Sequence, residues 1–158
     1  MRHPGFFTTV AILFTALGCK SDSQMRSYEV VVRNDSSKSV TVWLMKEGPP
    51  PEAGWMSPEY VATHGRGDEP FSGTVIPPGE TQSTGNRAGE FMPNSVAVLR
   101  FYRGAPRFNQ MLATNSGSPD RAQFDLTPGY NGFQVIDKYG DQAISRMSAT
   151  PPPPTTQP

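Results

Sequence analysis

Short apolar stretches, many of them with a period of two, recur between residues 27 and 147 of this chain and predict a domain built of β-strands. Clusters of Asn, Asp, Gly and Pro separate these stretches at intervals of roughly 8–12 residues, a spacing typical of sandwich domains. We therefore predict an all-β fold: an antiparallel β-sandwich of the immunoglobulin-like kind, with a short helix in an insertion. The predicted strands cover 27–33, 39–46, 74–76, 95–103, 110–114, 122–126, 130–137 and 142–147.

The first two of these strands are expected to pair as a hairpin. Between them lies Asn34-Asp-Ser-Ser-Lys38, a cluster of turn-forming residues. Residues 95–103 carry apolar side chains at successive positions, which predicts a central strand covered on both faces. Residues 81–94 are mostly polar and contain glycine, so we expect mainly loop there, with a weak strand.

The segment 48–70 is an insertion that begins with Gly48-Pro-Pro-Pro51. Proline cannot donate to a sheet ladder, so the run ends the preceding strand. Within the insertion, Ser57-Pro58-Glu59 predicts a helix start, with Ser57 as N-cap, and Gly65 predicts its end. Further along, Pro77-Pro-Gly-Glu80 fits a type II turn.

The phrase Leu126-Thr-Pro-Gly-Tyr-Asn-Gly-Phe-Gln-Val135 resembles the corner before the penultimate strand of many immunoglobulin-like sandwiches. That resemblance implies the tyrosine-corner position for Tyr130 or Phe133. Residues 149–158 are rich in proline and are expected to form an extended, solvated tail.

The N-terminus has the organisation of an export signal. Arg2 is followed by an apolar run from Phe6 to Leu17, too short to span a bilayer of ~30 Å as a helix. The run ends in Ala-Leu-Gly-Cys19 and turns polar at once. Here the sequence resembles a bacterial lipoprotein precursor, with Ala16 at the position where that class usually has Leu.

The resemblance implies cleavage before Cys19, whose thiol and new amino terminus would carry acyl chains such as palmitate. Stable anchoring needs more than one chain, a condition that multiple acylation meets. Cys19 is the only cysteine, so it has no disulfide partner within the chain. The expected organisation is a signal peptide (1–18), a lipidated N-terminus and tether (19–26), a sandwich domain (27–148) and the tail. An ordinary cleaved signal peptide and an uncleaved N-terminus are the alternatives.

Lys20 follows the cysteine instead of the Asp associated with inner-membrane retention, so the resemblance favours the outer membrane of the cell envelope. Removal of residues 1–18 takes away only Arg2 among the Lys, Arg, Asp and Glu residues. The mature chain then has 13 Lys and Arg against 14 Asp and Glu, close to neutral. This balance argues against nucleic acid as a partner.

Catalytic and metal-binding motifs are sparse. His64 is the only histidine of the mature chain, so a histidine-based metal cluster is excluded, and no G-x-S-x-G motif is present. We expect no metal and no cofactor. The aromatic residues Trp55 and Tyr60 of the insertion, and Trp43, are the candidate ligand-binding residues, because exposed rings can stack on sugars or anchor a protein. The alternative is that Trp43 fills the core and Trp55 fixes the insertion to the sheet.

These observations favour a non-enzymatic module, anchored to the membrane through Cys19, that binds a protein or glycan of the envelope. A hydrolase using His64 with a serine or Asp68 is an alternative, which requires a deep cleft beside His64 and a nucleophile within hydrogen-bond reach. A structural spacer or assembly lipoprotein is the third hypothesis.

Overall fold

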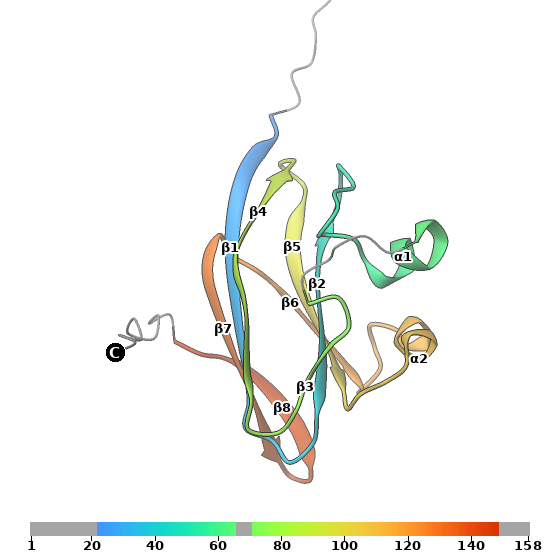
Figure 1. The fold of residues 1–158 in the computed structure, drawn as a ribbon, viewed down its shortest axis with the longest axis vertical. Helices are drawn as coiled ribbons and strands as arrows, with labels where there is room; N and C mark the ends of the chain where they lie inside the picture. Colours follow the sequence, from blue (N-terminus) through green and yellow to red (C-terminus); the bar gives the residue numbers. More distant parts are fainter. Residues whose placement is uncertain (1–21, 66–70, 149–158) are drawn as a thin grey trace, which may run out of the picture.

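Ten helices and strands follow one another in residues 22–65 and 71–148, the parts of the chain that the computed structural model describes (Figure 1). The strands are β1 (Gln24–Asn34), β2 (Val40–Glu47), β3 (Thr74–Ile76), β4 (Thr81–Phe91), β5 (Val96–Arg103), β6 (Arg121–Asp125), β7 (Gly129–Lys138) and β8 (Asp141–Arg146). The helices are α1 (Pro58–His64) and α2 (Phe108–Ala113). The predicted signal peptide, Cys19 and the C-terminal tail lie outside the described residues.

The strands form two four-stranded sheets that pack face to face, which confirms the all-β sandwich. Sheet A has the order β4-β1-β7-β8, and sheet B has the order β3-β2-β5-β6. The pairs are antiparallel with one exception, since β1 and β7 run parallel. The sequence predicts an antiparallel sandwich, and the sheets are mainly antiparallel, with β1 and β7 as the one parallel pair.

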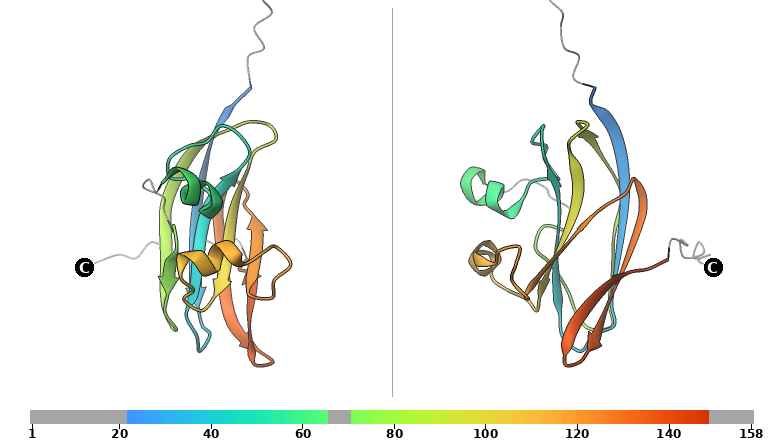
Figure 2. Two further views of the ribbon diagram at one scale, coloured as in Figure 1. Left: turned by 90° about the vertical axis from the view of Figure 1, so that its right-hand side faces the viewer. Right: turned by 180° about the vertical axis from the view of Figure 1, so that it is seen from behind.

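Two hydrophobic clusters hold the layers together. The main core lies between the sheets, where the rings of Phe101, Phe124 and Phe133 pack with centroids 5.2–5.7 Å apart. A second cluster covers the outer face of sheet B, where Trp43 and Tyr102 meet Val61 of α1 and Met111 of α2. Both helices lie on this side of the sandwich (Figure 2). The double cover explains why β5 is apolar on both faces.

The predicted hairpin between residues 27–33 and 39–46 is wrong. β1 pairs with β4 and β7, whereas β2 pairs with β3 and β5 in the other sheet. Residues 35–39 therefore form an arch that carries the chain from one sheet to the other. The period-two pattern specifies which face of each strand is buried, and it does not specify the neighbour that each strand pairs with.

A buried polar network holds this arch. Asn34 is fully buried; its Nδ2 donates to the carbonyls of Lys38 and Ile76, both at 2.9 Å, and its Oδ1 accepts from Ser36 N and Oγ. Gln142 of β8 donates from Nε2 to Ser36 Oγ and to the carbonyl of Lys38. The network satisfies backbone groups that a sheet ladder would otherwise pair.

Two further predictions need correction. Residues 81–91 form the long edge strand β4 where mainly loop was expected; most of its residues are exposed, so the strand carries little apolar pattern. Residues 108–113 form helix α2, whereas 110–114 was expected to be a strand. Gln110 Oε1 accepts from Arg107 N at the start of α2, and Phe108 packs against Trp43.

Helix α1 confirms the predicted signals at both ends. Ser57 Oγ accepts from Tyr60 N at 3.1 Å, Pro58 is the first helical residue and Gly65 follows the last turn. The turn at 77–80 is also confirmed, with Gly79 at φ 78°. Neither α1 nor α2, the helices of the described residues, is long and apolar enough to cross a membrane.

The corner between β6 and β7 is organised by an asparagine. Asn131 is buried, donates from Nδ2 to the carbonyls of Thr127 and Gly129, and accepts from Thr127 N at Oδ1. Phe133 is a core residue and Tyr130 is half-buried. The hydrogen bonds of this corner thus come from the residue next to the predicted tyrosine.

Candidate functional site

The insertion brings two of the three predicted ligand-binding residues to one small pocket. Trp55 and Tyr60 line a hollow of about 110 Å³ together with Lys46 and Glu52. Trp55 itself is only 3% exposed, and its ring packs edge-on against Tyr28 at 5.6 Å and Phe91 at 5.3 Å. The hollow is well below the several hundred Å³ usual for small-molecule sites, so it offers space for a few water molecules.

A buried lysine joins this insertion to sheet A. The Nζ of Lys46 lies 3.0 Å from Glu52 Oε2 and donates to the carbonyl of Glu90 at 2.7 Å, while its side chain is 1% exposed. Glu52 Oε2 also accepts from Glu90 N at 2.9 Å. The contacts of Trp55 and Lys46 fix the insertion in place, as the structural alternative for Trp55 expects.

Trp43 does not join the other two predicted residues. Its ring is fully buried on the outer face of sheet B, Nε1 donates to the carbonyl of Met56 at 2.9 Å, and Phe108 of α2 lies 5.8 Å away. Trp43 therefore fills the cluster beneath the two helices. In the described structure neither tryptophan presents a ring face to solvent.

His64 is exposed at the last turn of α1. Its ring stacks on Tyr60 with centroids 4.0 Å apart, and Nδ1 lies 2.6 Å from Thr63 Oγ1 and 3.2 Å from the carbonyl of Tyr60. These partners belong to its own helix, and Asp68 lies outside the described residues. A general base must lie within reach of the proton it removes, so the hydrolase hypothesis gains no support from the described contacts.

Arg100 ties helix α1 to sheet B. Its Nη1 donates to Glu59 Oε1 at 2.6 Å, and its Nε donates to Gln123 Oε1 at 3.0 Å. Burial raises the pKa of Glu59, but the hydrogen bond from its own backbone and the contact with Arg100 outweigh this, so its pKa lies below the ordinary 4.5. Next to Arg100, burial raises the pKa of Tyr102, and the neighbouring guanidinium of Arg100 offsets only part of this. These polar groups are part of the packing of α1 and α2.

A larger hollow lies elsewhere, along the open side of the sandwich between β6 and β8. We call it the lateral groove: a space of about 560 Å³ between two edge strands that do not pair with each other. Its lining comprises Arg103, Pro119, Arg121, Ala122, Phe124, Lys138, Tyr139, Asp141, Gln142, Ala143 and Ile144. Half-buried Phe124 and Ile144 give it apolar surface.

Positive charge predominates along the groove. Arg103, Arg121 and Lys138 face a single carboxylate among the lining residues, Asp141, which pairs with Arg103 at 2.6 Å. Within the described residues neither Lys138 nor Arg121 has a carboxylate within 4.0 Å. A groove with two uncompensated cations attracts anionic groups.

Tyr139 at the end of the groove has an unusual backbone. It lies in the turn between β7 and β8 with φ 54°, followed by Gly140 at φ 84°. Asn and Asp tolerate this left-handed region, whereas a bulky residue there costs roughly 1–2 kcal/mol. Tyr139 is 97% exposed, and the ring contact described for it is with Lys138 Nζ, 5.5 Å from its centroid.

Phe71 provides the comparison. It is the other described residue besides glycine with a positive φ, 57°, and it is buried in the main core. Packing of the ring in the core therefore compensates the backbone of Phe71, while the ring of Tyr139 is outside the core and has only the contact with Lys138. Strained, exposed positions of this kind concentrate at functional sites.

In the sequence, residues 138–141 lie between the predicted strands 130–137 and 142–147, and nothing there singled out Tyr139. The available signal was the dipeptide Tyr-Gly at a hairpin turn, where Asn-Gly or Asp-Gly is the favoured choice. The groove itself depends on which strands become edges, and no local pattern encodes that.

Within the described residues, no group of three or more His, Cys, Asp or Glu side chains is placed to hold a metal ion. Comparison of the chain with models of protein families, with curated proteins and with solved structures finds no match. The inference of function therefore depends on the site and on the N-terminal sequence.

Proposed function

We propose that this chain is a non-enzymatic binding module of the bacterial cell envelope, held to the membrane by acyl chains on Cys19. The lateral groove is the surface that binds a protein or glycan of the envelope. The observation that carries the proposal is the coincidence of three features in this groove: a volume in the range of ligand sites, uncompensated positive charge and the strained, exposed Tyr139.

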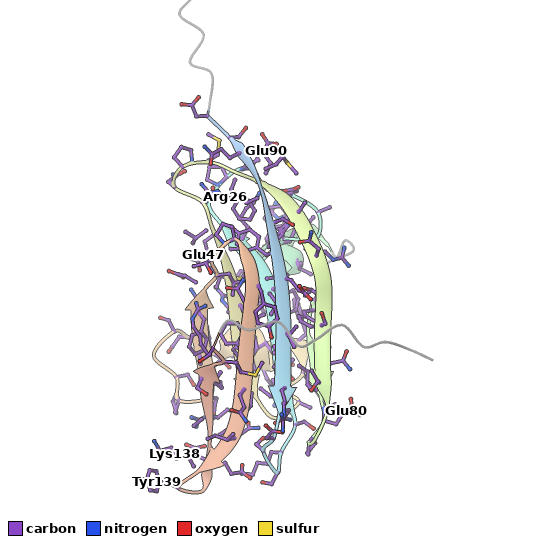
Figure 3. The ribbon with its side chains drawn as sticks, turned by 90° about the vertical axis from the view of Figure 1, so that its left-hand side faces the viewer. Arg26, Glu47, Glu80, Glu90, Lys138 and Tyr139 are labelled. Atoms are coloured by element: carbon purple, nitrogen blue, oxygen red, sulfur yellow. The ribbon has the colours of Figure 1, made fainter. Side chains whose placement is uncertain are left out.

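The position of the groove is consistent with such a role. Lys138 and Tyr139 lie at one end of the sandwich, and Arg26 and Glu90, near the start of β1, lie at the other (Figure 3). Only residues 20–23 separate Cys19 from the first residue of β1. An anchor at Cys19 therefore holds the opposite end against the lipid and directs Tyr139 away from the membrane.

The test combines two measurements on protein from its native membrane. The first is the intact mass, with Cys19→Ala as control: acyl groups on a chain that begins at Cys19 support the anchor, and an unmodified mass refutes it. The second replaces Tyr139 with a photo-crosslinking phenylalanine analogue, with the same replacement of exposed Val75 on β3 as the matched control.

We expect an envelope component to crosslink at position 139 and not at position 75. Equal crosslinking at both positions would refute the groove as the binding surface. Absence of any crosslinked component would instead favour the structural spacer.

A further inference from the structure

The exposed ring of Tyr139 and the free charge of Lys138 occur side by side at the end of the lateral groove, and together they indicate a ligand class. We propose that the groove binds a saccharide that carries a carboxylate. The sugar ring stacks on Tyr139, and the carboxylate binds the ammonium group of Lys138. This inference rests on the proposed binding function and specifies its ligand.

The charge of the groove selects an anion. Arg103 is neutralised by Asp141, so Lys138 is the exposed cation of the lining that is free to pair with a ligand, and Arg121 adds a second positive charge. Carboxylate partners of an ammonium group form charge-assisted hydrogen bonds. A neutral saccharide would leave this charge unused.

The ring of Tyr139 selects a flat, partly apolar ligand face. The ring is almost completely exposed, and its hydroxyl can donate or accept a hydrogen bond beside it. The only contact described for this ring is with Lys138 Nζ, 5.5 Å from its centroid, so the ring remains open to a ligand, and contact with a ligand would account for its placement in a left-handed turn. A ligand that consists of a carboxylate without a ring could bind Lys138 but would make no use of the exposed ring of Tyr139.

Hydrogen bonds at both edges of the groove disfavour the addition of a peptide strand. Arg103 of β5 donates from Nη2 to the carbonyl of Gln142 on β8 at 3.1 Å, and Arg146 of β8 donates to the carbonyl of Asp125 on β6. Each edge strand thus has a backbone acceptor occupied by an arginine from the opposite sheet. Strand addition needs these acceptors, so an extended peptide is the less favoured occupant.

The size of the groove also fits a short saccharide. Its volume of about 560 Å³ lies in the middle of the range of 300–1,000 Å³ that is usual for small-ligand sites. Phe124 and Ile144 provide apolar surface on the side of the groove that faces the core.

The test uses the full, processed protein in detergent and three probes: trigalacturonic acid, the neutral galactose trisaccharide and a triglutamate peptide. We expect the acidic trisaccharide to bind at least tenfold more tightly than the neutral one by calorimetry. We also expect its affinity to fall as salt is added, because the contact with Lys138 is exposed.

The variants separate the two contacts. Tyr139→Asn should lower the affinity for trigalacturonic acid at least fivefold, Tyr139→Phe should retain it, and Lys138→Gln should lower it at least fivefold and reduce its salt dependence. Arg87→Gln on β4, at the opposite edge of sheet A, removes the same charge and should change nothing. Asn tolerates the left-handed turn, so Tyr139→Asn should fold with an unfolding midpoint at least equal to that of the unmodified protein.

The outcomes distinguish this inference from the function on which it rests. Equal affinity for triglutamate, with dependence on Lys138 but not on Tyr139, overturns the saccharide and leaves a binding groove. No binding of any probe, while the envelope component still crosslinks at position 139 and Lys138→Gln abolishes that crosslink, also overturns only the saccharide. No binding of any probe, together with equal crosslinking at positions 139 and 75, overturns both.

Discussion

Replacement of Asn34 by alanine tests whether the polar network of the arch joins the two sheets. The side chain of Asn34 makes four hydrogen bonds: two from Nδ2 to the carbonyls of Lys38 and Ile76, and two accepted by Oδ1 from Ser36. The residue is fully buried, so water does not replace these partners in the unmodified fold. Asn34→Ala removes all four contacts and leaves the carbonyl of Ile76 without this donor.

The magnitude follows from the hydrogen bonds that are lost. A typical intramolecular hydrogen bond contributes about 1 kcal/mol net, and a buried group left unsatisfied costs about 1–3 kcal/mol. Part of the network survives, because Gln142 still donates to Ser36 Oγ and to the carbonyl of Lys38. We therefore expect a loss of about 2–4 kcal/mol in the free energy of unfolding, which is large for a domain whose total is about 5–15 kcal/mol.

The replacement Asn34→Asp makes the test stricter. Aspartate keeps an acceptor for Ser36 but presents a carboxylate oxygen to the carbonyls of Lys38 and Ile76, where an acceptor meets acceptors. We expect Asn34→Asp to be at least as destabilising as Asn34→Ala at neutral pH. A view based on shape alone predicts the opposite order, since Asp has nearly the volume of Asn.

Urea unfolding followed by tryptophan fluorescence measures both variants, with exposed Asn94→Ala as the matched control. For an m value of about 2 kcal/mol/M, the midpoint of Asn34→Ala should fall by roughly 1–2 M. A fall similar to that of Asn94→Ala, or an Asp variant clearly more stable than the Ala variant, would refute the role assigned to the network.

Three further predictions concern the remaining contacts. The pKa of Glu59 is lowered in the fold, so the carboxylate adds to the free energy of unfolding above the ordinary pKa of 4.5, and this contribution is lost as the pH falls through the folded pKa. The difference in free energy of unfolding between the unmodified protein and Glu59→Gln should therefore shrink on acidification in urea titrations. A difference that stays constant with pH would contradict this. Gly89→Ala should destabilise by about 1–3 kcal/mol through overpacking, because its Cβ would lie 2.6 Å from Trp55 Nε1; a shift of Trp emission checks the contact, and exposed Ala88→Ser is the control. Trp43→Phe should lower the free energy of unfolding by about 1–3 kcal/mol, because the hydrogen bond to the carbonyl of Met56 and part of the ring volume are lost. Amide hydrogen exchange in α1 should also become faster. Unchanged stability would show that the indole ring is not part of the packing.

Local signals in the sequence predict the elements of this fold better than their partners. Ser57, Pro58 and Gly65 determine the ends of α1, because capping involves backbone groups within a few residues. Residues 35–39 have the composition of a hairpin turn but form an arch. The hydrogen bond from Asn34 Nδ2 to the carbonyl of Ile76 joins residues 42 positions apart, so no local pattern predicts it. Strand β4 was underestimated because its edge position leaves most side chains exposed, and Gly89 is needed only where Trp55 approaches it.

The candidate site was predictable only in its chemistry. The residues predicted for an aromatic contact are Trp43, Trp55 and Tyr60. Both tryptophans are buried in the two clusters, and Tyr60 is half-buried beside His64. Tyr139 carries the exposed ring instead. Its distinguishing property is a backbone angle, which the sequence expresses only as an unfavourable residue at a turn.

The geometry of the sandwich limits what the groove can reach if Cys19 is the anchor. β1 has 11 residues and, at about 3.3 Å per residue, spans roughly 35 Å between its first residue, which follows Cys19 by five positions in the sequence, and the end of the sandwich where Tyr139 lies (Figure 3). The Debye length at physiological ionic strength is about 8 Å, so charge on the lipid surface is screened well before it reaches Lys138. With the anchor at Cys19, we therefore expect that the positive groove does not hold the domain on anionic lipid and that its proposed ligand belongs to structures that stand away from the membrane. It follows that binding of an acidic saccharide should be the same in detergent as in vesicles with and without anionic lipid; tighter binding in neutral vesicles alone would place the groove near the lipid surface and refute this orientation.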